Sequence, residues 1–166
     1  HRRRHSFPTR RSSDLTHTLL TTWKNAATSN AWPAGSYKNY ARVYLPPSSS
    51  IQQVKIGDTT LSSAEYTVSE EHGRLVLSYL ITVPINNLTT STVIYTNNTK
   101  ITSGSFYTLY FQRQSGSRPS DKISVTYNLP LYLKPLKLSP EPSLLEAQKL
   151  SFGFLNDTDH RLSIQF

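Results

Sequence analysis

The chain has 166 residues and a net charge of +8, from 18 basic and 10 acidic residues, and it contains neither cysteine nor methionine. Disulfide bonds and thiolate chemistry are therefore excluded. No apolar run approaches the ~20 residues that a membrane-spanning helix needs. The length is sufficient for one domain with a substantial hydrophobic core.

Residues 5–15 resemble one reading frame of a common short-read sequencing adapter. We therefore expect residues 1–15 to be non-native and disordered, and the chain to be a C-terminal fragment from metagenomic sequence whose natural part begins near Thr16. Without these residues, 13 basic and 9 acidic side chains remain, a net charge of +4 with no basic run. We therefore predict no nucleic-acid partner.

Apolar and polar residues alternate along most of the chain, which is typical of half-buried β-strands. Turn residues such as His72-Gly73 and Asn97-Asn98 separate the alternating runs. The predicted strands are residues 18–23, 39–45, 51–56, 65–69, 74–83, 92–95, 106–113, 122–129, 148–155 and the C-terminal residues around Leu162, Ile164 and Phe166.

About nine or ten short strands with frequent turns predict an all-β fold, an antiparallel β-sandwich of the immunoglobulin-like kind. Residues 65–83 are expected to form a hairpin, and residues 140–149 the one short helix. Prolines interrupt the chain between residues 130 and 142, which indicates an edge strand or a linker. We therefore expect a sandwich domain over residues 16–130. Residues 131–166 are expected to be a Pro-rich connection with C-terminal strands that complete the sheet or start a second one.

Residues 32–46 carry the most specific motif of the chain, Trp-Pro-Ala-Gly-Ser-Tyr-Lys-Asn-Tyr-Ala-Arg-Val-Tyr-Leu-Pro. This motif resembles the C-terminal region of the bacterial domain-of-unknown-function family 4012. Residues 107–116, with their Gln-Arg-Gln-Ser-Gly end, and the terminal segment 150–166 resemble later parts of the same region, although Ser115 stands where the family often has proline. The resemblance implies an envelope protein with an N-terminal membrane helix, and it implies no particular activity.

The residues of this motif are also the best candidates for ligand contact. In the strand after the Trp32–Gly35 turn, Tyr40, Arg42 and Tyr44 share one face, which is either a cross-strand stacking ladder or an exposed patch. Gln112, Arg113 and Gln114 either contact a ligand or end a strand by hydrogen bonding to the next loop. The candidate ligand-binding residues are Trp32, Tyr37, Tyr40, Arg42, Tyr44, Gln112, Arg113 and Gln114.

Catalytic and metal-binding patterns are absent from the sequence. His17, His72 and His160 are scattered without metal-ligand spacing. Glu70 and Glu71 are adjacent in a predicted strand and so point to opposite faces. The Asn156–Asp159 loop indicates a capped turn, with a calcium site as the alternative. We therefore predict no catalytic residue, no metal and no cofactor.

Together these patterns predict a non-catalytic β-sandwich module of a bacterial cell-envelope protein, on the extracytoplasmic side, with a structural or interaction role. The alternative is a carbohydrate-binding module that recognises a cell-wall or extracellular glycan through aromatic rings. An enzyme is the third and weakest hypothesis. The expected partners are a cell-wall glycan or another envelope protein, and membrane contact is expected only through an upstream anchor.

Overall fold

The computed structural model describes residues 15–113 and 117–166. Throughout these ranges the chain is all-β, with 13 short antiparallel strands in four small sheets and no helix. This confirms the predicted all-β, antiparallel class. Ten strands correspond to the ten predicted runs, and the three additional strands, β4, β10 and β11, have only two or three residues each. Such short strands carry too few residues for alternation to reveal them.

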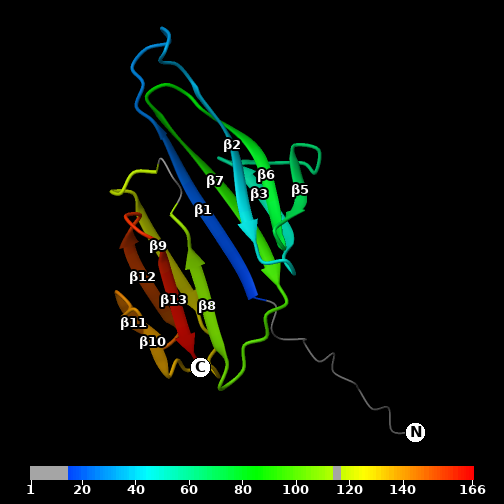
Figure 1. Cartoon of the computed structure of the whole chain (residues 1–166), viewed down its shortest axis with the longest axis vertical. Helices are drawn as coiled ribbons and strands as arrows, with labels where there is room; N and C mark the ends of the chain where they lie inside the picture. Colours follow the sequence, from blue (N-terminus) through cyan, green and yellow to red (C-terminus); the bar gives the residue numbers. More distant parts are fainter. Residues whose placement is uncertain (1–14, 114–116) are drawn as a thin grey trace, which may run out of the picture. The chain divides into compact units, whose positions relative to one another are not determined.

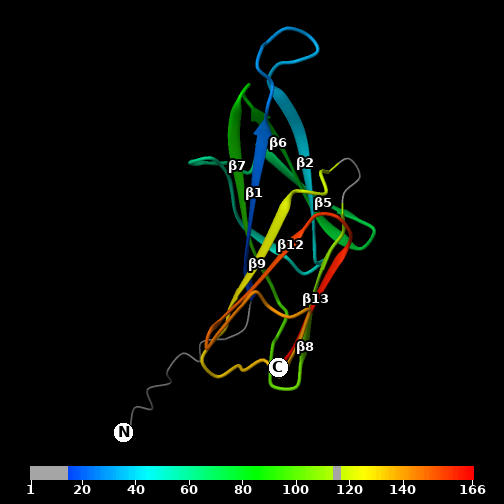
Figure 2. The same cartoon turned by 90° about the vertical axis from the view of Figure 1, so that its left-hand side faces the viewer.

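The first compact unit of the chain ends at Lys100 and has two sheets, drawn from blue to green in Figures 1 and 2. One sheet has the order β1-β7-β3-β4 and the other has the order β2-β6-β5. The strands are β1 (Leu15–Asn25), β2 (Tyr37–Leu45), β3 (Ser50–Ile56), β4 (Thr59–Thr60), β5 (Tyr66–Glu71), β6 (Arg74–Val83) and β7 (Asn87–Asn97). The loop that joins β1 to β2, residues 26–36, projects beyond the ends of both strands in the two views.

The core of this unit takes side chains from both sheets. Leu77 and Tyr79 of β6 belong to one buried cluster with Val93 and Tyr95 of β7 and Val54 of β3. The apolar residues that alternate along β6 therefore form the face of the strand that packs against the opposite sheet, as the sequence predicts.

Ser91 of β7 provides the hydrogen-bond acceptor for two aromatic donors in this core. Its Oγ accepts from the Tyr79 hydroxyl at 3.0 Å and from the indole Nε1 of Trp23 at 3.2 Å. A buried donor without a partner costs free energy. A single small side chain thus allows two large amphipathic rings to pack inside.

The predicted hairpin over residues 65–83 is confirmed. Strands β5 and β6 pair in an unbroken register from Tyr66 opposite Tyr79 to Glu71 opposite Arg74. The two turn residues, His72 and Gly73, have φ of 49° and 69°. A two-residue turn with both φ angles positive matches the right-handed twist of the flanking strands, and glycine adopts this conformation at little cost.

The second compact unit runs from Ile101 to Phe166 and has two three-stranded sheets. Their orders are β10-β13-β8 and β11-β12-β9. The strands are β8 (Phe106–Phe111), β9 (Lys122–Asn128), β10 (Lys137–Ser139), β11 (Leu144–Glu146), β12 (Lys149–Leu155) and β13 (His160–Gln165).

Aromatic rings meet edge to face in the core of the second unit. The Tyr127 ring of β9 lies 5.7 Å from Tyr107 of β8 and 6.0 Å from Phe152 of β12, measured between centroids, with interplanar angles of 79° and 86°. Phe111 and Phe154 form a similar pair at 5.6 Å. The Tyr107–Tyr127 and Phe111–Phe154 contacts join the two sheets, whereas Tyr127 and Phe152 lie on neighbouring strands of one sheet. Edge-to-face geometry is favourable because it places the positive ring edge on the negative face.

The helix expected over residues 140–149 is wrong. Strand β11 lies there instead and pairs with β12, from Leu144 opposite Ser151 to Glu146 opposite Lys149. Ser143 adds hydrogen bonds from its backbone N (2.8 Å) and its Oγ (2.9 Å) to the Ser151 carbonyl. The Pro140 and Pro142 breakers leave too short a run for a helix, and pairing with β12 satisfies the backbone groups instead.

Two further expectations concern where the fold begins and divides. Leu15, the last residue of the segment expected to be disordered, is half-buried and pairs with Asn97 as the first residue of β1; the rest of that segment lies outside the described residues. The chain divides into its two units between Lys100 and Ile101. The boundary expected at residue 130 falls inside the second unit, because β8 and β9 pair with β13 and β12.

Candidate functional site

Strand β2 separates a buried face from an exposed aromatic face, as its alternation predicts. Ala41 and Leu45 are buried in the core. Tyr40 and Tyr44, on the other face, are 58% and 48% exposed, and Arg42 lies exposed between them. We call the side chains of Tyr40, Arg42 and Tyr44 the aromatic face.

Arg42 bridges the sheet from one edge to the other. Its guanidinium forms an ion pair with Oε1 of Glu71, which lies on β5 beyond the central strand β6. The Tyr44 hydroxyl donates to the other Glu71 oxygen, Oε2, at 3.4 Å. The guanidinium carbon also lies 5.5 Å from the Tyr44 ring centroid, which is within cation–π range. Both carboxylate oxygens of Glu71 are thereby engaged.

The aromatic face covers the middle of the central strand. Tyr44 lies opposite Val76 and Arg42 lies opposite Ser78 in the β2–β6 register. Both β6 residues are buried although they point away from the core. The Tyr40 side chain reaches across β6 to β5, where its hydroxyl oxygen lies 3.4 Å from Oγ1 of Thr67. Of the two interpretations left open by the sequence, the contacts favour a cross-strand ladder whose rings remain half exposed.

The electrostatics of this face follow from the same contacts. The hydrogen bond from Arg42 lowers the pKa of the Glu71 carboxyl below its ordinary value of 4.5 and raises that of Arg42. Hydrogen bonds with Thr67 and Ser78 lower the pKa of the Tyr40 hydroxyl. Glu71 is therefore a carboxylate near neutral pH, and it serves as the anionic partner of Arg42.

Neither Trp32 nor Tyr37 belongs to the aromatic face. Tyr37 lies on the same side of β2 as the buried residues Ala41 and Leu45, because side chains alternate along a strand. It is nevertheless exposed, since it is the first residue of the strand. Trp32 lies in the 26–36 loop and is 93% exposed. An exposed indole on a loop can contact a ligand without rearranging a core.

Buried Asn25 anchors this loop, and the sequence interpretation missed it. Its Nδ2 donates to the carbonyls of Gly35 at 2.8 Å and Val83 at 3.1 Å, and its Oδ1 accepts from the backbone N of Ala27 at 3.0 Å. An asparagine at a strand end is a common turn former, but neither its burial nor its bond to Val83 can be read from local sequence.

The second group of candidate residues belongs to the second unit. The backbone N of Arg113 donates to Oδ1 of Asp159 at 2.8 Å, while the Tyr110 hydroxyl donates to Oδ2 of the same carboxylate. The Arg113 side chain reaches the Ser117 carbonyl at 3.4 Å. These contacts favour the strand-end interpretation of Arg113 and the capped-turn interpretation of Asp159. Gln112 is exposed, and Gln114 lies outside the described residues.

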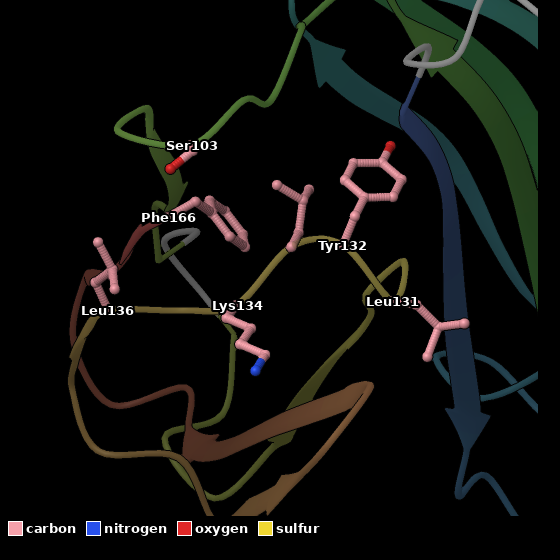
Figure 3. Close-up of a pocket in the computed structure, with 7 residues that line it drawn as sticks. Ser103, Leu131, Tyr132, Lys134, Leu136 and Phe166 are labelled. Atoms are coloured by element: carbon pink, nitrogen blue, oxygen red, sulfur yellow. The ribbon is translucent and has the colours of Figure 1, made fainter.

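An open hollow of about 310 Å³ lies elsewhere in the second unit, and its lining is drawn in Figure 3. Sequence interpretation missed it, because the prolines around residues 130–136 indicated only an edge strand or a linker. Leu131, Tyr132 and Leu136 of this segment are largely exposed. The hollow is lined by Ser103, Leu131, Tyr132, Leu133, Lys134, Leu136 and Phe166.

The described histidines lie in three separate places in the fold. His17 stacks on Tyr95 at 4.6 Å, and burial lowers its pKa. His72 lies in the β5–β6 turn, and His160 lies 3.3 Å from an Asp157 oxygen. Across residues 15–113 and 117–166, no three His, Asp or Glu side chains gather as metal ligands would, and no helix is long and apolar enough to span a bilayer.

Comparison with known proteins yields no relative: no family model, no curated protein and no solved structure matches the chain. The resemblance of residues 32–46 to domain-of-unknown-function family 4012 therefore stays a prediction. The candidate site rests on the geometry of the aromatic face and on the exposed Trp32.

Proposed function

We propose that the chain is a non-catalytic interaction module of a bacterial cell-envelope protein, placed on the extracytoplasmic side. The observation that carries the proposal is the aromatic face, where half-exposed rings are fixed in position by Glu71 and Thr67. Exposed large side chains held by cross-strand contacts suit recognition, because little conformational entropy is lost when they bind a partner. The fold assignment within this proposal is an immunoglobulin-like sandwich, supported by the core that both sheets of the first unit share.

Several contacts support a structural rather than a catalytic use of the acidic side chains. Glu71 has both oxygens engaged by Arg42 and Tyr44, and Asp159 has both engaged by Tyr110 and the Arg113 backbone. A general base must be free to receive a proton from a substrate. The pKa of each of these carboxyls is lowered by its hydrogen bonds, which opposes proton uptake near neutral pH.

Cell fractionation tests the envelope location. The protein, tagged at its C-terminus, is expected in the envelope fraction and is expected to be cleaved by protease added to intact cells or spheroplasts. A cytosolic marker in the same cells must stay protected. Recovery of the tagged protein with that marker would overturn the proposal.

A carbohydrate-binding module is the second candidate, favoured by the exposure of Trp32, Tyr40 and Tyr44 within one segment. Aromatic rings bind the apolar faces of sugars, and nearby amides and charged groups provide polar contacts. Binding to a glycan array or to peptidoglycan is expected to fall at least tenfold on Trp32→Ala or Tyr40→Ala. Tyr132→Ala, an exposed tyrosine of the second unit, is the matched control. Equal loss with the control, or no glycan bound by the unmodified chain, would reject this candidate.

A further inference from the structure

Strand β1 is a long edge strand with one side of its backbone unpaired by any described strand. It lies at the end of the β1-β7-β3-β4 order. On its paired side it runs against β7 without a bulge for eleven residues, from Leu15 opposite Asn97 to Asn25 opposite Asn87. Alternate N–H and C=O groups of such a strand point to the open side, where they can template a further strand.

The other edge strands of the first unit carry features that discourage such pairing. Strand β4 has two residues. Strand β5 ends in Glu70 and Glu71, and β2 carries Lys38 and Arg42. Short length and charged side chains are the usual protection of exposed edges. Strand β1 has no proline, and Lys24 is its single Lys, Arg, Asp or Glu residue. Among the described strands that end a sheet in this unit, β1 is the longest, and it combines this length with a single charged side chain.

We propose that β1 pairs with β1 of a second copy of this chain, antiparallel, about a two-fold axis at Leu20. In this register Leu20 lies opposite Leu20, Thr18 opposite Thr22, and Thr16 opposite Lys24. Facing threonines are favourable cross-strand pairs, and β1 already makes two of them with β7, Thr16 with Thr96 and Thr22 with Thr90. Leu20, 63% exposed in the single chain, becomes partly covered by its symmetry mate.

The side-chain pattern of β1 is self-complementary in this register. An axis at Lys24 would set two lysines directly opposite each other, and like charges in that position are destabilising. An axis at Thr22 would bring Lys24 opposite exposed Leu20. The axis at Leu20 separates the two lysines by placing each opposite a Thr16, and it pairs Thr18 with Thr22 and Leu20 with Leu20. A two-fold pairing is closed, so assembly stops at the dimer.

Sedimentation velocity over a range of concentrations tests the proposal with the full chain. We expect a monomer–dimer equilibrium that Leu20→Glu weakens about tenfold or more, because two glutamates would face each other. Leu88→Glu is the matched control. Leu88 is 58% exposed and lies on the same face of the same sheet, but on the central strand β7, opposite Lys24. Dimerisation of this control is expected to be unchanged.

Three results would overturn the proposal: a monomer at every concentration, equal weakening by both substitutions, or open-ended assembly. Cysteine cross-linking tests the register independently, because the chain contains no cysteine. Under mild oxidation, Leu20→Cys is expected to form a disulfide-linked dimer, whereas Leu88→Cys is not. Efficient cross-linking of both variants, or of neither, would contradict pairing through β1 at Leu20.

Discussion

The two units of the chain accommodate buried aromatic side chains in different ways. In the first unit, Trp23 and Tyr79 enter the core because Ser91 accepts a hydrogen bond from each. In the second unit, Tyr127 meets Phe152 edge to face within one sheet, and the Tyr107–Tyr127 and Phe111–Phe154 contacts join the two sheets. Trp23 and Tyr79 in the first core thus need a polar acceptor for their donors, whereas Phe152 in the second contributes only apolar volume. Substitutions at these sites should therefore have different physical consequences.

The largest expected effect is the loss of volume in the second unit. Phe152→Ala removes a buried ring and should lower the free energy of unfolding of this unit by about 3–5 kcal/mol. Both tryptophans, Trp23 and Trp32, lie in the first unit. Their fluorescence in a urea titration should therefore keep the unmodified midpoint, while tyrosine signals and far-UV circular dichroism report the loss.

Leu77→Ala in the first core is the counterpart, since it should shift the tryptophan transition instead. If Phe152→Ala moves the tryptophan midpoint as far as Leu77→Ala does, the two cores are not separate in energy, and the comparison fails.

An intermediate loss of stability is expected when the shared hydrogen-bond acceptor of the first core is removed. Ser91→Ala leaves the Tyr79 hydroxyl and the Trp23 indole without their shared acceptor, and should cost about 1–3 kcal/mol. The tryptophan-detected urea midpoint measures it. Tyr79→Phe removes one donor together with its need for a partner, so it should cost less. A larger cost for Tyr79→Phe than for Ser91→Ala would contradict the role of Ser91 as an acceptor that both rings need.

The smallest effect is expected at the exposed ion pair of the aromatic face. Arg42 lowers the pKa of Glu71 in the folded state. The stabilisation from this ion pair is therefore fully present above the pKa that Glu71 has in the unfolded chain, and it is lost as the pH falls through the lower pKa of the folded state. The difference in urea midpoint between the unmodified chain and Glu71→Gln should therefore shrink from pH 7 to pH 3. Glu70→Gln, the same change on the opposite face of β5, is the control. A pH-independent difference for Glu71→Gln would contradict the ion-pair explanation.

Local sequence was sufficient where a property depends on neighbours one or two residues away. The buried faces of β6, β9, β12 and β13 follow directly from alternation, and His72-Gly73 predicted the β5–β6 turn. The helix expected over residues 140–149 failed for the complementary reason. There the local pattern was ambiguous, and the partner strand β12 decided the outcome.

The candidate site shows the same limit. Sequence placed Tyr40, Arg42 and Tyr44 on one face of a strand, since side chains alternate with a period of two. It could not place Glu71, 29 residues away, beneath Arg42, nor could it find the hollow beside Phe166.

The sequence by itself determined the strand class, most strand positions and the exposed side of β2. Tertiary structure alone decided that β8 and β9 pair with the C-terminal strands, that Ser91 accepts hydrogen bonds from two rings, and that β1 is the end strand of its sheet among the described strands. The physical reason is the distance along the chain over which each property is set. Alternation is imposed by the backbone of one strand, whereas strand order and shared acceptors depend on residues brought together only when distant segments pair.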